Sequence, residues 1–222
     1  RDTLDLPQAL DDEGGRLAAF LIGLLVIAGA TYVGADFASR SITNQLVFEP
    51  RRLRLWLGKA LAVSIAGALF VLVALSAYWV TMLLVADARG LTLPDADLSV
   101  VGWHVLRAVA LAAGAALGAY ALTMLFRHTV AALALLFVYA AGSEILVALL
   151  PMQGMARWTI GNNVFGWLKP DFEYVDPAGE CAPFKECNPV HALAHLDAGL
   201  FLLGLLVVAV VASVVSFSRR DV

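Results

Sequence analysis

The chain has 222 residues, of which 61% are apolar and only 15% are charged, and its formal net charge at pH 7 is −3. A composition this apolar excludes an ordinary soluble domain, and the charge leaves no basic face for binding nucleic acid. We therefore expect a polytopic membrane protein that forms a single transmembrane domain over residues 1–222.

Five apolar runs are long enough to cross a hydrocarbon core, which takes about 20 helical residues. They predict membrane helices at 17–35, 56–86, 101–125, 129–150 and 198–217. None of these runs shows the alternating pattern of a barrel strand, and backbone groups in lipid must be paired within their own segment. The expected fold class is therefore all-α.

Residues 36–55 form a polar connector between the first two runs. Ile42 and Leu46 are four residues apart, which puts them on one face of a short amphipathic helix. Pro50 disfavours helical geometry at Glu49, so this helix should end there. Two interpretations are open: an ordinary loop lying on the membrane surface, or a docking element for a partner.

A basic cluster follows the connector helix and leads into the second run. It consists of Arg51, Arg52, Arg54 and, one turn further on, Lys59. Long basic side chains can reach the headgroups from a membrane helix, and they are attracted to anionic lipid. We predict that this cluster anchors the connector to the membrane surface.

Basic residues gather on one predicted side of the bundle. That side holds Arg40, Arg51, Arg52, Arg54, Lys59, Arg127, Arg219 and Arg220. Short loops rich in Lys and Arg are cytoplasmic, so the connector and the C terminus are predicted to be inside. The segment 1–16 and the long loop 151–196 then lie outside.

Two ionisable residues fall within the predicted membrane helices, Arg107 and Glu144. Their depths agree within about one turn, counted at ~1.5 Å per residue on helices joined by a short turn. A charge at such depth is costly unless it is paired or hydrated. Either the two residues form an ion pair that fixes packing, or they contact cargo or line a polar cavity.

The outer loop 151–196 is too long for a simple connection. Its first half is rich in apolar and aromatic residues broken by glycines, and Trp and Tyr favour the membrane boundary. We predict two short helices there, lying at the outer interface or re-entering it. They serve either as anchors or as a lid over an exit path.

Cys181 and Cys187 lie in the second half of the outer loop. On an oxidising side of the membrane a disulfide between them is the expected state. A metal site is the alternative, because Cys181, Cys187, His191 and His195 have a Cys-x5-Cys-x3-His-x3-His spacing.

The connector and its flanks carry a distinctive set of residues: Gly34, Asp36, Leu46, Pro50, Arg51, Arg52 and Lys59. This set resembles the cytoplasmic signature of ABC-2 type transporter permeases, the membrane subunits of ABC exporters. It differs at Arg40 and Ser41, where many members carry Gly-Thr. The resemblance implies a further amphipathic helix and membrane helix upstream, six crossings in the full-length protein, and a bacterial plasma (inner) membrane.

The resemblance also implies what the connector does. In this family it is similar to a coupling helix that docks on a separate ATP-binding subunit. The expected coupling residues are Asp36, Arg40, Ile42, Leu46, Glu49 and Pro50. Dimerisation with a second permease copy, or with a related permease, would complete the transport pathway, with membrane lipids around it.

No nucleotide-binding motif occurs in the sequence, so ATP and Mg would belong to the partner subunit and this chain would not be the enzyme. Two alternatives remain. One is an accessory or immunity subunit that transports nothing. The other is a metal-dependent membrane enzyme, which rests on His191 and His195 alone.

Overall fold

The computed structural model describes residues 13–48, 51–90, 98–150, 152, 154–169, 171–176 and 190–219. Within them lie the helices α2 (Gly15–Ala38), α3 (Ser41–Phe48), α4 (Arg52–Ala88), α5 (Leu98–Phe126), α6 (Thr129–Leu149), η2 (Ala156–Trp158), α7 (Ile160–Leu168) and α8 (His195–Arg219). Two short strands, β1 (Glu173–Val175) and β2 (Val190–Ala192), pair antiparallel.

Five of these helices, α2, α4, α5, α6 and α8, are long and apolar enough to cross a membrane. The predicted fold class is confirmed: this is an all-α polytopic membrane protein, and its membrane helices correspond to the five apolar runs. The largest difference is in α4, which has 37 residues. At ~1.5 Å per residue it is roughly 55 Å long, well beyond a core of about 30 Å.

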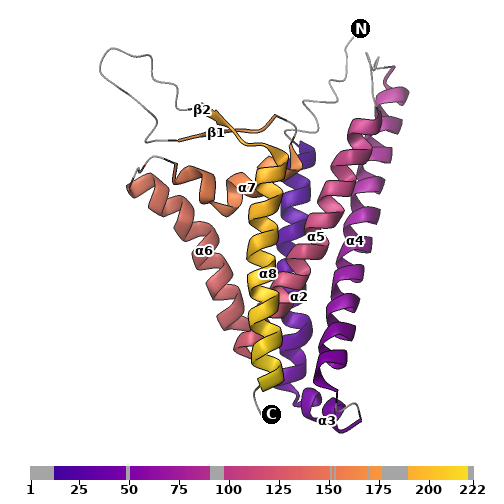
Figure 1. The fold of residues 1–222 in the computed structure, drawn as a ribbon. Coiled ribbons are helices and arrows are strands. Elements are labelled where there is room, and N and C mark those ends of the chain that lie inside the picture. The colour runs from indigo at the N-terminus through magenta and orange to yellow at the C-terminus, as the bar shows by residue number, and fades with distance from the viewer. Residues whose placement is uncertain are drawn as a thin grey trace.

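The helices form a bundle with two distinct ends (Figure 1). The short helix α3 and the C-terminal end of α8 lie at one end, which we name the connector end. Helix α7 and the β1–β2 hairpin lie at the other, which we name the hairpin end. Helix α6 diverges from α8 toward the hairpin end (Figure 1).

Helix α5 occupies the centre of the bundle because its buried face is lined with alanine. Its buried alanines are Ala108, Ala112, Ala116, Ala119 and Ala121. Small side chains let neighbouring backbones approach closely. At Gly29 of α2, an added Cβ would lie 2.5 Å from the backbone oxygen of Ala116, so the two backbones are in direct contact.

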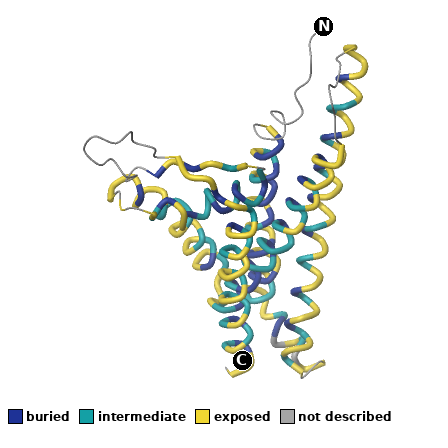
Figure 2. Tube along the Cα trace, turned by 45° about the horizontal axis from the view of Figure 1, so that its top comes forward, coloured by how far each residue is buried: buried dark blue, intermediate teal, exposed yellow. Residues whose placement is uncertain are grey.

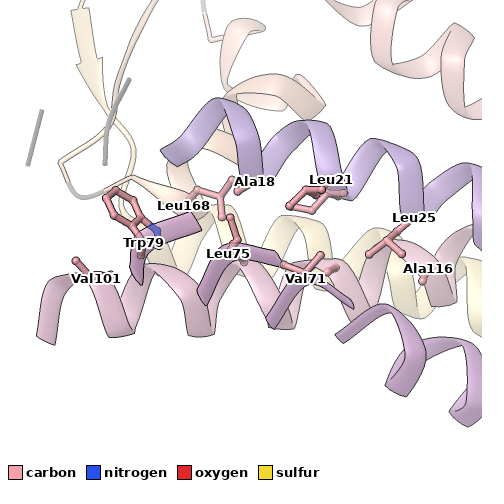
Figure 3. Close-up of a cluster of buried hydrophobic side chains, with 12 residues drawn as sticks. Ala18, Leu21, Leu25, Val71, Leu75, Trp79, Val101, Ala116 and Leu168 are labelled. Carbon is pink, nitrogen blue, oxygen red and sulfur yellow. The ribbon is translucent and has the colours of Figure 1, made fainter. Parts of the chain in front are cut away.

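Larger apolar side chains fill the space around this seam (Figure 3). Leu21 and Leu25 of α2 meet Val71 and Leu75 of α4, and all four are buried. Trp79 of α4, Val101 of α5 and Leu168 of α7 complete the cluster. Buried residues concentrate in the middle of the bundle, and exposed ones cover its periphery (Figure 2).

Gly114 and Gly118 of α5 belong to a row of small residues that also suits a contact with a second chain. In the structure the row receives a helix of the same chain. Side-chain atoms of Leu206 in α8 lie 3.6 Å and 3.5 Å from Cβ positions built on these glycines. The row is therefore explained by packing within one bundle.

Candidate functional site

The connector begins with a tight turn between α2 and α3. The backbone N–H groups of Ser39 and Arg40 bond back to the carbonyls of Ala35 and Phe37, which closes α2. Arg40 then has a φ of 57°, a left-handed conformation that is uncommon outside glycine. This single residue reverses the chain so that α3 lies across the end of the bundle, and its own side chain is exposed.

Asp36 is the polar centre of this end of the fold. One carboxylate oxygen binds the ammonium of Lys59 at 2.5 Å, and the other accepts from the Ser41 hydroxyl at 2.7 Å. The Lys59 ammonium also lies 5.4 Å from the ring centre of Tyr32. One carboxylate thus ties α2 to both α3 and α4. Lys59 therefore binds protein rather than headgroups, which differs from its predicted role, while the coupling role of Asp36 stays a prediction.

Ile42 likewise differs from its prediction as an outward docking residue. Its side chain is only 2% exposed and belongs to a buried cluster with Val33, Trp56 and Phe217. The physical reason is that an amphipathic helix at the end of a bundle turns its apolar face inward. Ile42 therefore holds α3 in place, and the surface that α3 presents outward must be made by other residues.

The outward surface of α3 ends in two exposed apolar side chains, Val47 and Phe48, which we name the α3 tip. They are 77% and 89% exposed. The sequence contains a signal for this, because Leu46, Val47 and Phe48 are consecutive, and three consecutive residues turn through roughly 200° at 3.6 residues per turn, too wide for one inward face. The other predicted coupling positions, namely the side chain of Leu46 and residues Glu49 and Pro50, lie outside the described part of the chain.

Three arginines stand beside the α3 tip at the start of α4. Arg51 and Arg54 are exposed and Arg52 is partly buried. They lie at the positively charged end of the α4 dipole, so an anionic surface would stabilise all of them. This position suits their predicted role at a headgroup layer.

Comparisons with models of protein families, with curated proteins and with solved structures find no significant match.

The hairpin end contains a second polar constellation, centred on Arg107 and His195. The guanidinium of Arg107 donates to Nε2 of His195 at 3.0 Å, and Nδ1 of His195 lies 2.7 Å from the carbonyl oxygen of Gly166. The indole N–H of Trp167 donates to the carbonyl of Arg107 at 3.0 Å. These bonds join α5, α7 and α8, and we name them the outer clamp.

The outer clamp replaces the expected ion pair between Arg107 and Glu144. Among the described residues the ion pairs are Lys59 with Asp36 and Arg157 with Asp197, and Glu144 belongs to neither. Glu144 is exposed on α6, and its carboxylate lies against Gly161 in the first turn of α7. The two residues have similar depth, but Arg107 faces α8 instead.

The two short helices expected in the outer loop correspond to η2 and α7. The N-cap of α7 is Thr159, whose side chain accepts from the N–H of Asn162. The hairpin that follows was not predicted. It buries Tyr174, and this burial raises the pKa of the phenol.

The cysteines and histidines of the outer loop do not assemble a metal centre within the described part of the chain. Cys181 and Cys187 lie outside that part, so the disulfide stays a prediction. His191 lies in β2 beside the Tyr174 ring, and both ring nitrogens of His195 are occupied in the outer clamp. The described residues contain no group of three or more potential metal ligands.

Proposed function

We propose that this chain is the membrane permease subunit of an ATP-driven exporter of the ABC-2 type, and that its α3 tip contacts a separate ATP-binding subunit. The observation that carries the proposal is the two-sided character of α3. Its inner side is fixed to the bundle by Ile42, while Val47 and Phe48 project outward. Large apolar side chains exposed at the end of a connector suit a protein contact.

The residues that carry the family resemblance support this proposal by their structural roles. Gly34 of α2 lies so close to Thr129 of α6 that no side chain fits there. Asp36 binds Lys59 and Ser41. Arg40, where the sequence departs from the family pattern, has a left-handed backbone of the kind that glycine adopts easily. Asp36 and Arg40 therefore set the geometry of the connector and hold α3 against the bundle.

This attachment of α3 to the bundle suits the transmission of force. A push on the α3 tip would reach α2 and α4 through the Asp36–Lys59 ion pair, and α5 through the cluster around Ile42. A connector that packs against the bundle on one side and contacts a partner on the other can transmit the partner's movement to the membrane helices. ATP and Mg would act in the partner, and a second permease copy, identical or related, would complete the pathway.

The same proposal sets the orientation. The connector end would be cytoplasmic and the hairpin end external, as the distribution of basic residues predicts. The C terminus would then be cytoplasmic, and the protein would lie in the plasma (inner) membrane of a bacterium.

The test uses the α3 tip and a matched control. The variant carrying Val47→Asp and Phe48→Asp should insert and stay monodisperse in detergent, because both side chains are exposed. It should lose the ATP-hydrolysing subunit that copurifies with the parent chain, since a carboxylate in an apolar contact is costly. Leu46→Asp extends the series to the predicted coupling position.

The control is Asn44→Asp, which adds one negative charge at an exposed position of the same helix. It should retain the ATP-hydrolysing subunit and ATP-dependent transport. The proposal fails if the parent chain binds no such subunit, or if the tip variant binds it and supports transport normally. A chain that binds the subunit while the reconstituted complex moves no cargo would be an accessory subunit.

A further inference from the structure

Glu144 is the one charged residue in the sequence of α6, between Thr129 and Leu149. It lies five residues before the end of the helix, which is about 7.5 Å at the usual rise. Its side chain is exposed at the surface of the bundle, on the helix that leans away from α8 (Figure 1). An ionisable group in such a place is costly and marks a functional site by default.

Within the described part of the chain, the charge of Glu144 is not neutralised by a cation. The obvious candidate, Arg107, binds His195 in the outer clamp. The carboxylate instead approaches the backbone of α7, where a Cβ built on Gly161 would lie 2.7 Å from Oε1. This is the first turn of α7, where the backbone N–H groups carry partial positive charge. The side chain of Glu144 stays exposed beside this turn.

Two aromatic residues belong to the elements around this carboxylate: Tyr139 lies on α6, and Trp158 lies in η2, three residues before Gly161. Tyr139 of α6 is 37% exposed, and its hydroxyl lies 3.5 Å from the carbonyl oxygen of Trp158. The Trp158 ring is 59% exposed and packs on Phe201 of α8 at 5.7 Å between ring centres. The guanidinium of Arg157 lies 5.7 Å from the same ring, and its charge is paired with Asp197 at 3.0 Å.

We propose that Glu144, together with Tyr139 and Trp158, forms a binding site for a lipophilic organic cation, an amine or quaternary ammonium with an apolar body. The carboxylate supplies the counter-charge, and the rings supply the cation–π attraction that recognises such groups. Ile145 and Leu149, exposed by 57% and 73%, offer apolar surface for the rest of the molecule. The inference that this cation is cargo rests on the proposed export function. The inference that the cation binds at this site does not.

Binding can be measured on the purified full chain, without ATP or any partner, by equilibrium dialysis with tetraphenylphosphonium. This probe carries a permanent charge, so its own protonation plays no part. We expect one saturable site per chain, and at least tenfold weaker binding in Glu144→Gln. Glutamine keeps the size and shape of the side chain, removes its charge and replaces one acceptor oxygen with a donor NH2 group. Triphenylphosphine oxide, an uncharged analogue, should bind both proteins alike.

Two further variants make the result specific to this carboxylate. Glu173→Gln removes an exposed carboxylate from β1 and should bind the probe as the parent does. Glu144→Asp keeps the charge and should retain more affinity than Glu144→Gln. Should Glu144→Gln fail to fold, Tyr139→Leu provides a second measurement and should weaken binding several-fold.

The proposal is overturned if the parent shows no saturable binding, if Glu144→Gln binds as tightly as the parent, or if Glu144→Asp and Glu144→Gln are equally weak. Because the measurement needs no ATP-binding subunit, either proposal can fail without the other. A parent that binds the cation but couples to no ATPase would refute the exporter alone.

Discussion

Arg107 donates to Nε2 of His195 over 3.0 Å, and this bond fixes the position of the histidine's proton. A guanidinium has no acceptor atom, so Nε2 must be the acceptor and the proton must be on Nδ1. Nδ1 then donates to the carbonyl of Gly166 at 2.7 Å. One neutral histidine therefore joins α5, α7 and α8.

The first prediction follows from this clamp. His195→Ala removes both bonds, and we expect the free energy of unfolding to fall by about 2–3 kcal/mol, since a hydrogen bond to a charged group contributes roughly 1.5–3 kcal/mol. His191→Ala, at an exposed position of β2, should change it by less than about 0.5 kcal/mol. Denaturant unfolding in detergent measures both. Equal losses would mean that the clamp does not stabilise the fold.

A second prediction concerns the contact between α2 and α5. Gly29→Ala places a methyl group against the backbone of Ala116 and should lower the melting temperature markedly, because backbone cannot move aside as a side chain does. Gly23→Ala on the same helix meets no atom within 4 Å and should be neutral or slightly stabilising. Thermal unfolding of the two variants decides the matter. A Gly29→Ala protein as stable as the parent would contradict this packing.

The third prediction separates the two sides of α3. Ile42→Ala empties a buried position and should cost about 2–4 kcal/mol of unfolding free energy. Val47→Ala changes an exposed side chain and should leave stability within about 0.5 kcal/mol. Similar values for the two variants would contradict the burial of Ile42 against the bundle.

The Asp36–Lys59 ion pair gives a fourth prediction. Asp36→Asn and Lys59→Gln should each destabilise the protein, because each leaves a charged partner in a largely buried setting. The double variant should lose less than the sum of the two, with a coupling energy of about 1–2 kcal/mol. A double-mutant cycle of unfolding free energies provides the measurement. Additive losses would argue against a direct interaction.

A fifth prediction concerns Cys181 and Cys187, which lie outside the described residues. Under non-reducing conditions both should resist a thiol reagent, and the intact mass should be two hydrogens below that of the dithiol. Reduction should cost at most a few kcal/mol, because the closed loop is short. Free thiols with one zinc ion bound per chain would instead favour the metal site.

The membrane helices could be predicted from the sequence because length and apolarity are local properties. The orientation of single side chains could not. Ile42 has the correct period for an amphipathic helix, yet periodicity does not say whether the apolar face meets the bundle or a partner. The same limit applies to Arg107. Its depth along the membrane helix matches that of Glu144, but the rotation of α5 relative to α8 directs its side chain toward His195.

Contacts between residues far apart in the chain could not be predicted from the sequence either. Asp36 and Lys59 are 23 residues apart, and Arg107 and His195 are 88 apart. No spacing rule links such positions, because packing of the complete bundle brings them together. The β1–β2 hairpin could not be predicted for a different reason: its strands have three residues each, too few to show an alternating pattern.

The direct contact of Gly29 with the Ala116 backbone also bears on how the molecule can move. Where two helices touch without an intervening layer of side chains, neither can slide or roll without collision. Helix α6 has only two buried residues among those described, Ala132 and Val147, and it follows a turn in which Arg127 has a φ of 57°. We therefore expect the α2–α5 seam to act as a fixed spine, and α6 to be the part that swings on its hinge.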